Sequence, residues 1–462
     1  MNKYKKLAAN TLLFSIGSFS SKILSLFLLK LYTKYIPEAD FSVTSEIQYI
    51  INLLGPIVTL SISEGILKYG IEKKYKKEQV YTTGLMTCIS GLAAGMVILW
   101  IISPFLGYQE YLPYMMMFLF TAEFRWVQQQ YAKVKNYIKL YTVDSILSVF
   151  SLLLFSLLFL VVFKLSIKGY ILALIMSDLC SIFFLMYCAN MTGDIKMRYR
   201  NEELSSRMIR YSIPLIPTSI LWWIVSSSDS FMVSRFISRE VNGVYQVAYR
   251  IPNLISLMSV IFFRAWQMSA ITEYDSPQRR RYYTKVFDAY TSIMFVAASG
   301  IMLFLKMFTH ILTDKAYWNS FRMAPFLVVG VLMQSFCNFL SSIYNASNQN
   351  KNSLWTSSIA AGTNIVLNII LIPIFGVQGA AFATMFSYFA CFIIRIMDTQ
   401  RIAKYTLSWR KIGTNLCIII LSAIVILADV PLMQLWLAVF FAAMLVVNAG
   451  PLEQTARKLI GR

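Results

Sequence analysis

Residues 140–163 read LYTVDSILSVFSLLLFSLLFLVVF and contain a single charged side chain, Asp144. A helix needs about 20 predominantly apolar residues to cross the hydrocarbon core of a membrane. This stretch is long enough and apolar enough to meet that requirement. It therefore predicts a membrane-spanning helix, and the rest of the chain follows the same pattern.

Hydrophobic residues make up 57% of the chain and charged residues only 14%. The mean hydropathy is +0.60, a balance typical of integral membrane proteins and not of soluble domains of this size. About 14 spans are predicted, a number that depends on very short connections near 376 and 430. They are 7–33, 42–66, 81–106, 113–132, 140–163, 169–190, 211–234, 243–267, 286–308, 323–344, 355–375, 377–397, 412–429 and 431–449.

The net charge of +20 is distributed unevenly between the connections. Most lysines and arginines outside the spans fall in alternate connections, beginning with Lys3, Lys5 and Lys6. By the positive-inside rule, this asymmetry predicts both termini on the cytoplasmic side of a bacterial cytoplasmic membrane. The basic excess therefore indicates topology and anionic lipid, not nucleic-acid binding. The first apolar stretch lacks a convincing cleavage site and is expected to remain as the first helix.

No cofactor or metal site is expected from the sequence. All six cysteines fall within predicted spans without a paired spacing. The only histidine, His310, lies at the outer end of a predicted helix, where an interfacial role is typical. The chain contains no Walker lysine motif, so its sequence gives no support for ATP hydrolysis.

Two halves of the chain carry similar segments in the same order. Tyr131-Ala-Lys-Val-Lys-Asn136 and Lys168-Gly169-Tyr170 correspond to Tyr344-Asn-Ala-Ser-Asn-Gln349 and Gln378-Gly379-Ala380. An even number of spans separates the copies, which predicts parallel repeats with a substrate cavity between two lobes. Chance likeness between apolar helices is the alternative. The expected domains are an N-lobe over 1–200, a C-lobe over 201–398, and C-terminal helices with a short tail over 399–462.

Charges inside the predicted spans are the main guide to function. A charge at bilayer depth costs about 2.5–3.5 kcal/mol, so it usually faces a polar cavity or a partner. In the first span, Lys22 shares a helix face with Ser15, Ser18 and Ser25. That face suits a water-filled cavity wall, or a close helix-packing seam in which Lys22 pairs with an acid.

The span 243–267 places Arg250, Asn253 and Arg264 on one stripe of a continuous helix. Arginine stays charged when buried and binds phosphate oxygens through a planar fork, so an anionic lipid head group is a suitable ligand. In the alternative interpretation, Arg250 lies near the outer end of the span and Arg264 reaches the inner interface.

Other spans also carry polar residues. Asp229 in 211–234 either neutralises Arg250 from the adjacent helix or forms a proton or Na⁺ site, and Asn52 lies on a polar face of 42–66. The remaining candidates either line the cavity or pair with one another: Glu123, Arg125, Asp144, Asp178, Asn364 and Asn368.

Several segments together carry a family resemblance. They are NTLLFSIG (10–17), SK (21–22), LYT (31–33), LGPIVTLSISEG (54–65), QQYAKV (129–134), GVYQVAYRIP (243–252) and FGVQGAAFAT (375–384). In this order they resemble the polysaccharide-transporter (Wzx-like, O-antigen flippase) family of the multidrug/oligosaccharidyl-lipid/polysaccharide (MOP) superfamily, over nearly the whole chain. One departure is visible, because Ala39-Asp40-Phe41 stands where the family often has Glu-Tyr-Gly.

The resemblance implies an all-α, MATE-like membrane fold with two six-helix lobes in parallel repeat, two C-terminal helices and a V-shaped cavity. It implies a flippase that moves undecaprenyl-pyrophosphate-linked oligosaccharide to the outer leaflet by alternating access, for surface polysaccharide biosynthesis. Its partners would be that substrate, membrane lipids, H⁺ or Na⁺ as coupling ion, and polysaccharide assembly proteins. The residues expected to contact substrate are Lys22, Asn52, Asp229, Arg250, Asn253 and Arg264.

Three other functions remain open at this stage. A lipid II flippase shares the expected fold and a pyrophosphate cargo. A multidrug exporter of the superfamily often has an acidic coupling residue in its first span, whereas this first span carries lysines and no acid. A glycan polymerase or acyltransferase would need a convergent acid, base or nucleophile, and the sequence shows none. We therefore expect a transporter with no catalytic residues.

Overall fold

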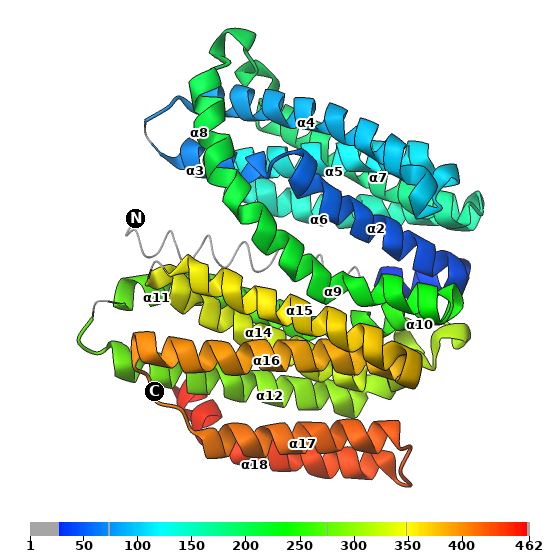
Figure 1. Ribbon diagram of the computed structural model, residues 1–462, viewed down its shortest axis with the longest axis vertical. Helices are drawn as coiled ribbons and strands as arrows, with labels where there is room; N and C mark the ends of the chain where they lie inside the picture. The colour runs from blue at the N-terminus through cyan, green and yellow to red at the C-terminus, as the bar shows by residue number, and fades with distance from the viewer. Residues whose placement is uncertain (1–26, 73, 275, 348, 460–462) are drawn as a thin grey trace. The chain divides into compact units, whose positions relative to one another are not determined.

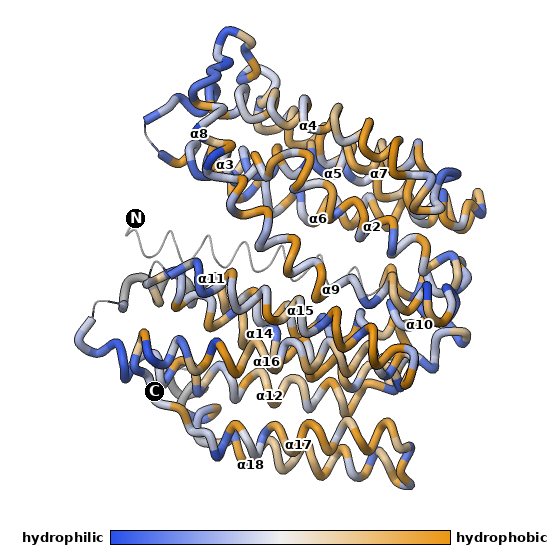
Figure 2. Tube along the Cα trace, viewed as in Figure 1, coloured by the Kyte–Doolittle hydropathy of each residue, from blue (hydrophilic) through white to orange (hydrophobic). Residues whose placement is uncertain are grey.

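The computed structural model describes residues 27–459, apart from 73, 275 and 348 (Figure 1). The described chain is helical throughout and contains no strand, which confirms the predicted all-α class. Most of the first predicted span, including Lys22, lies outside the described residues. Hydrophobic residues run along most of the long helices, and hydrophilic residues gather at helix ends and connections (Figure 2).

The helices alternate with short connections along the whole described chain. The longer ones are α2 Glu38–Val58, α3 Ile62–Ile71, α4 Lys77–Leu106, α5 Leu112–Val134, α6 Ile138–Ser156, α7 Ser166–Cys188, α8 Glu202–Ser212, α9 Ile216–Phe236, α10 Arg239–Arg250, α11 Asn253–Glu273, α12 Arg279–Leu312, α14 Pro325–Ala346, α15 Asn350–Phe375, α16 Val377–Ala403, α17 Trp409–Leu427 and α18 Met433–Leu459. The short ones are η1 Gln109–Tyr111, η2 Leu157–Val162, η3 Thr192–Asp194, η4 Met197–Tyr199, η5 Ile213–Leu215, η6 Lys315–Tyr317 and α13 Ser320–Met323.

The chain forms two compact units, unit 1 (Met1–Trp223) and unit 2 (Ile224–Arg462), which divide inside α9. Within unit 1, α5 packs against α2, α3, α4, α6 and α7. Within unit 2, α14 packs against α11, α12 and α16, while α17 and α18 pack on each other and on α12. The lobe boundary expected from the sequence, at 200/201, precedes α8 and remains a prediction of where the second repeat begins.

Ten helical segments of the described chain are long and apolar enough to cross a membrane, or eleven if α2 and α3 form one bent span. The expected count of 14 is therefore not reached. One reason is that most of the span 7–33 lies outside the described residues. Another is that α5 is rich in polar residues, and the predicted span 243–267 is divided between α10 and α11.

The predicted span 42–66 is bent by 54° between α2 and α3. Leu60 and Ser61 adopt left-handed backbone conformations with φ of 54° and 48°. The Leu60 N–H donates to the Ile57 carbonyl (3.2 Å) and the Ser61 N–H to the Pro56 carbonyl (2.8 Å). This pair of bonds is the Schellman motif, which satisfies terminal carbonyls and ends a helix. The bend is therefore a hydrogen-bonded helix end within one apolar stretch.

The predicted span 243–267 is also interrupted, because α10 ends at Arg250 and α11 begins at Asn253. Pro252 has no N–H to continue the ladder, and its ring clashes with the preceding turn. The common stripe of Arg250, Asn253 and Arg264 assumed a continuous helix. That part of the expectation is wrong, since Arg250 belongs to a different helix from the other two.

Two glycines at corresponding positions of the expected repeat, Gly169 and Gly379, have similar surroundings. A Cβ on Gly169, near the start of α7, would lie 3.1 Å from the carbonyl oxygen of Phe159 at the end of the preceding span. A Cβ on Gly379, near the start of α16, would lie 2.2 Å from the carbonyl oxygen of Leu371 at the end of α15. Both glycines thus let a helix begin against the backbone of the helix before it.

Replacing Gly379 with alanine should destabilise unit 2, because its methyl group would clash with backbone that cannot rotate away. We expect a loss of about 1–3 kcal/mol, typical of overpacking. The measurement is thermal unfolding of the detergent-purified protein. Gly413→Ala is the matched control, since nothing lies within 4 Å of a Cβ at that helical position. Equal melting temperatures for the two variants would contradict the close approach.

Candidate functional site

A buried carboxylate in α9 organises a polar cluster of unit 2. Asp229 is 1% exposed. Its Oδ2 accepts hydrogen bonds from the hydroxyls of Tyr245 and Tyr249, both at 2.7 Å, and from that of Thr384 at 3.3 Å. The two tyrosines are four residues apart on α10 and therefore share one helix face. Three helices, α9, α10 and α16, thus meet at one carboxylate.

Two asparagines of α15 extend this arrangement. The Asn364 amide donates to Thr384 Oγ1 (3.3 Å), while its Oδ1 accepts from Ser228 (3.1 Å) and from the Asn368 amide (3.0 Å). The buried Oδ1 of Asn368 has no hydrogen-bond partner within the described chain. We call Asp229, Tyr245, Tyr249, Asn364, Asn368 and Thr384 the Asp229 cluster.

The Asp229 cluster presents oxygen atoms and a carboxylate, without a compensating cation. None of the ion pairs formed by the described residues involves Asp229. The expected pairing with Arg250 is therefore not formed. An ionisable residue inside a membrane helix is by default a functional candidate. Oxygen ligands suit a proton or a small hard cation, and the cluster offers such ligands from four helices, α9, α10, α15 and α16.

The hydrogen-bond partners of Asp229 do not include Arg250 or Asn253, the two other expected residues of unit 2 whose side chains are described. Arg250 is exposed at the end of α10, and Asn253 is exposed at the start of α11. Arg264 lies within α11, and its side chain falls outside the described part of the structure, as does Lys22. Asn52 is exposed on α2 in unit 1. Among the expected residues whose side chains are described, only Asp229 belongs to a buried polar cluster.

In unit 1, two of the carboxylates within predicted spans have side-chain donors as partners. Arg125 forms an ion pair with Asp178 at 2.7 Å. Asp144 accepts hydrogen bonds from the Gln129 amide at 2.8 Å and from the Ser181 hydroxyl. For Arg125 and Asp178, the structure shows the pairing alternative of the sequence interpretation, whereas Asp144 is hydrogen bonded to neutral groups.

Glu123 has a different role in unit 1. Its carboxylate accepts from Thr59 Oγ1 at 3.3 Å, directly at the end of α2. It also occupies the space beside Gly55, where a Cβ would lie 2.0 Å from Glu123 Oε1. The carboxylate of α5 therefore contacts the bend between α2 and α3.

Arg395 of α16 was not singled out from the sequence, and it is the largest fully buried side chain. Its Nε donates to Thr356 Oγ1 (2.9 Å), and one terminal nitrogen donates to the Cys337 carbonyl (2.9 Å) and Ser341 Oγ (3.2 Å). The other terminal nitrogen donates to the Ser353 carbonyl (3.1 Å) and Ser357 Oγ (2.9 Å). The guanidinium thus joins α14, α15 and α16 through neutral oxygens.

The missed residues had recognisable signals. Tyr245, Tyr249 and Thr384 all fall within the segments GVYQVAYRIP and FGVQGAAFAT, which carry the family resemblance. Arg395 interrupts the predicted apolar span 377–397, so the criterion applied to Lys22 would also have selected it.

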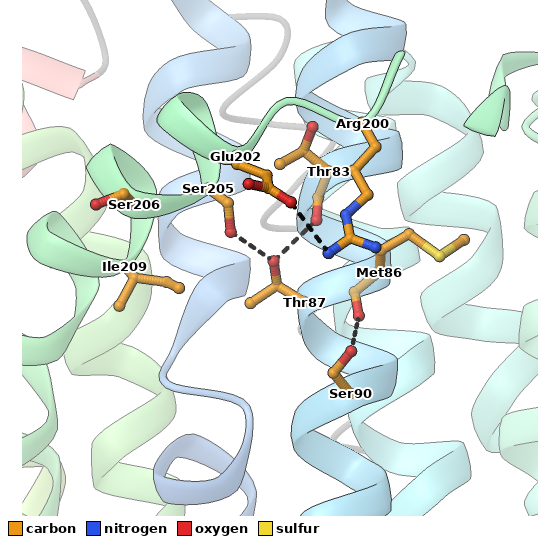
Figure 3. A pocket seen from close by; sticks show the side chains of 9 residues that line it. All are labelled: Thr83, Met86, Thr87, Ser90, Arg200, Glu202, Ser205, Ser206 and Ile209. Atoms are coloured by element: carbon orange, nitrogen blue, oxygen red, sulfur yellow. Dashed lines mark hydrogen bonds and ion pairs between the residues drawn. The ribbon is translucent and has the colours of Figure 1, made fainter. Parts of the chain in front are cut away.

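Unit 1 contains a hydroxyl-lined pocket of about 410 Å³ between α4 and α8 (Figure 3). Thr87 Oγ1 and Ser205 Oγ lie 3.0 Å apart across it, and Arg200 and Glu202 form an exposed ion pair of 3.8 Å at its edge. Thr83 accepts from the Asn201 N–H at 3.2 Å, which fastens the connection before α8 to α4. The pocket offers hydroxyls and a guanidinium to a polar ligand, and it is separate from the buried charges described above.

Comparison with known proteins defines the class to which this architecture belongs. The structure of the lipid II flippase MurJ in an inward closed conformation is similar over 97% of this chain and 100% of that chain, with a TM-score of 0.73 and 14% identity. An inward-facing multidrug resistance MATE family transporter of the MOP superfamily is similar over 84% of this chain and 99% of that one, with a TM-score of 0.66 and 13% identity. The fold is therefore that of MOP-superfamily transporters.

Sequence comparison then identifies the family. The sequence model described as polysaccharide biosynthesis protein matches residues 7–267, more than half of the chain, and the chain belongs to that family. A second model, described as lipid II flippase MurJ, matches residues 323–448. The probable low-salt glycan biosynthesis flippase Agl15 of Haloferax volcanii is 22% identical over 266 residues, covering 54% of this chain and 55% of that protein.

The chain spans about half the length of the curated relatives with the longer matches. The families and folds matched are those of flippases and transporters, not of catalytic enzymes. The family and MATE-like fold expected from the sequence are confirmed.

Arg395→Lys should destabilise unit 2 by about 2–5 kcal/mol, because lysine cannot reproduce the fork and leaves buried oxygens without donors. Chemical unfolding monitored by tryptophan fluorescence measures the change. Arg401→Lys, at an exposed position on the same helix, is the control and should change stability by less than about 0.5 kcal/mol. Similar losses in both variants would show that the Arg395 network has no special structural role.

Proposed function

We propose that this protein is a flippase for undecaprenyl-pyrophosphate-linked oligosaccharide, which it moves from the cytoplasmic to the outer leaflet for surface polysaccharide biosynthesis. The observation that carries the proposal is the match of the polysaccharide biosynthesis family over residues 7–267. The likeness to a probable glycan biosynthesis flippase supports it. The proposed location is the cytoplasmic membrane, with both termini in the cytoplasm, where polysaccharide assembly proteins would supply the substrate.

A lipid II flippase is the second candidate. The match of the MurJ model to residues 323–448 favours it specifically. Lipid II and lipid-linked oligosaccharide share a polyprenyl pyrophosphate, so both suit a site that binds phosphate through arginine or lysine. The two functions differ in the glycan, and a transport assay with both lipids separates them.

Purified protein in proteoliposomes should flip a fluorescent undecaprenyl-pyrophosphate oligosaccharide faster than lipid II, measured by reduction of the fluorophore at the outer surface. Lys22→Ala, Arg250→Ala and Arg264→Ala should each lower the initial rate by about 10-fold or more, as expected for the loss of a hydrogen bond between charged groups.

Arg235→Ala is the matched control for these variants, since it removes an exposed arginine from the last turn of α9. It should leave the rate unchanged. Faster transport of lipid II would support the second candidate instead. Full transport by all three cation variants would refute phosphate binding by these residues.

The coupling ion is a separate part of the proposal, and it rests on the Asp229 cluster. A carboxylate without a cationic partner, surrounded by hydroxyl and amide oxygens, is suited to bind H⁺ or Na⁺. Binding would neutralise the charge and alter the hydrogen bonds that join α9, α10 and α16. Alternating access requires such a change in helix contacts to follow ion binding.

Asp229→Asn should remove the stimulation of flipping by an imposed H⁺ or Na⁺ gradient, because asparagine keeps the shape but not the charge. The initial rate with a gradient should fall to the rate without one. Asp429→Asn, which breaks an exposed ion pair with Arg322 in the same unit, should retain the stimulation. Gradient stimulation that persists in the Asp229 variant would exclude this residue as the coupling site.

A further inference from the structure

A cavity in unit 2 brings together three cations from the start of α12 and the end of α16. It has a volume of about 550 Å³. Arg280 reaches it from the first turn of α12, Arg401 from the last turn of α16, and Lys404 from the end of that helix. All three side chains are exposed. The polar residues Gln400, Tyr405 and Thr406 complete its lining.

The walls of this cavity are held in place by hydrogen bonds. The Thr406 N–H donates to Thr284 Oγ1 at 2.9 Å, which fixes the connection after α16 to α12. Tyr405 is 2% exposed, and its hydroxyl lies 2.9 Å from Thr399 Oγ1. Lys404 ends α16 in a left-handed conformation with φ of 54°. The connection is therefore folded back against α12 and α16 without a ligand.

The charges of this cavity are not balanced by acids. In the part of the chain that the structure describes, Arg280, Arg401 and Lys404 form no ion pair, whereas the nearby Lys411 pairs with Asp288 at 2.8 Å. Three cations around one cavity repel one another, and an anion relieves that repulsion. Two guanidinium forks and an ammonium are the donors that phosphate oxygens prefer.

A neighbouring cavity of about 390 Å³ supplies an apolar surface. It shares Met397 and Arg401 with the basic cavity and is also lined by Trp355 and Ile394. Met397 is 52% exposed and Trp355 is 67% exposed, so both can contact lipid. Its one acid, Asp398, accepts a hydrogen bond from the Asn352 amide at 2.9 Å. A tryptophan beside a basic cavity is typical of the membrane interface.

We propose that these adjoining cavities form a binding site for an anionic phospholipid, separate from the transported lipid. The phosphate lies among Arg280, Arg401 and Lys404, and the acyl chains lie along Met397 and Trp355. Basic pockets between helices at the cytoplasmic side of a membrane bind anionic head groups in this way. The site is formed by unit 2 alone and does not depend on the identity of the cargo.

The test measures lipid binding to the delipidated full-length protein by native mass spectrometry. Phosphatidylglycerol and phosphatidylcholine with identical chains are the probes. The wild-type protein should retain phosphatidylglycerol at least about 10-fold more tightly than phosphatidylcholine, and the Arg280→Gln/Arg401→Gln/Lys404→Gln variant should lose that preference. Because these side chains are exposed, the variant should keep the wild-type melting temperature in phosphatidylcholine.

The matched control is Arg281→Gln/Lys285→Gln/Arg410→Gln, which removes equal charge from exposed positions outside the cavity. It should keep the preference for phosphatidylglycerol. Equal weakening of phosphatidylglycerol binding in both variants would overturn the proposal, because the preference would then come from the overall charge of the surface and not from this site. Inorganic phosphate that displaces phosphatidylglycerol at equal concentration would also overturn it, because the site would then bind free phosphate and not a lipid.

Discussion

One requirement dominates this structure: polar groups in helices that face an apolar medium must find hydrogen-bond partners within the protein. Arg395 of α16 meets it in full, because its guanidinium donates five hydrogen bonds to backbone carbonyls and hydroxyls of α14 and α15. The serines and threonines that accept these bonds lie within otherwise apolar helices. Their positions are explained by the guanidinium that they surround, and the guanidinium in turn fixes how α14, α15 and α16 pack.

Asp229 meets the same requirement differently. Hydroxyl donors from Tyr245, Tyr249 and Thr384 stabilise its carboxylate, but hydroxyls do not neutralise a charge as a cation does. The cluster is therefore sensitive to the gain of a proton or cation, whereas the Arg395 network is not, since arginine stays protonated. The contrast is between Arg395, whose charge is fixed, and a carboxylate whose charge can change.

Hydropathy alone was sufficient to predict the all-α membrane class and the positions of most helices. The two interrupted spans were not predictable in the same way. The bend after Val58 depends on left-handed Leu60 and Ser61, residues that rarely adopt that conformation, and on the carboxylate of Glu123 contributed by α5. Nothing local to 42–66 encodes that contact. Pro252 was a visible local signal of a helix break. The common stripe of Arg250, Asn253 and Arg264 was wrong because it assumed one continuous helix through Pro252.

The partners of Asp229 illustrate the remaining limit of the sequence. Tyr245 is reachable by local reasoning, since it lies only 16 residues after Asp229, on the next helix, but Thr384 is 155 residues away. Only the tertiary fold, in which α16 packs against α10, brings Thr384 to Asp229. The family segments pointed to the right residues without giving their contacts.

The two interruptions fall in the second predicted span of each repeat, and both adjoin a carboxylate. In unit 1, Glu123 accepts from Thr59 at the end of α2. In unit 2, Asp229 accepts from two tyrosines of α10, one turn before that helix ends. A helix that ends inside a span is not joined by a continuous i→i+4 hydrogen-bond ladder to the segment that follows it. A change in the charge of either carboxylate would therefore act on a short helix and not on a whole span. If transport proceeds by alternating access, as proposed, the carboxylates beside the two breaks would link ion coupling to the fold.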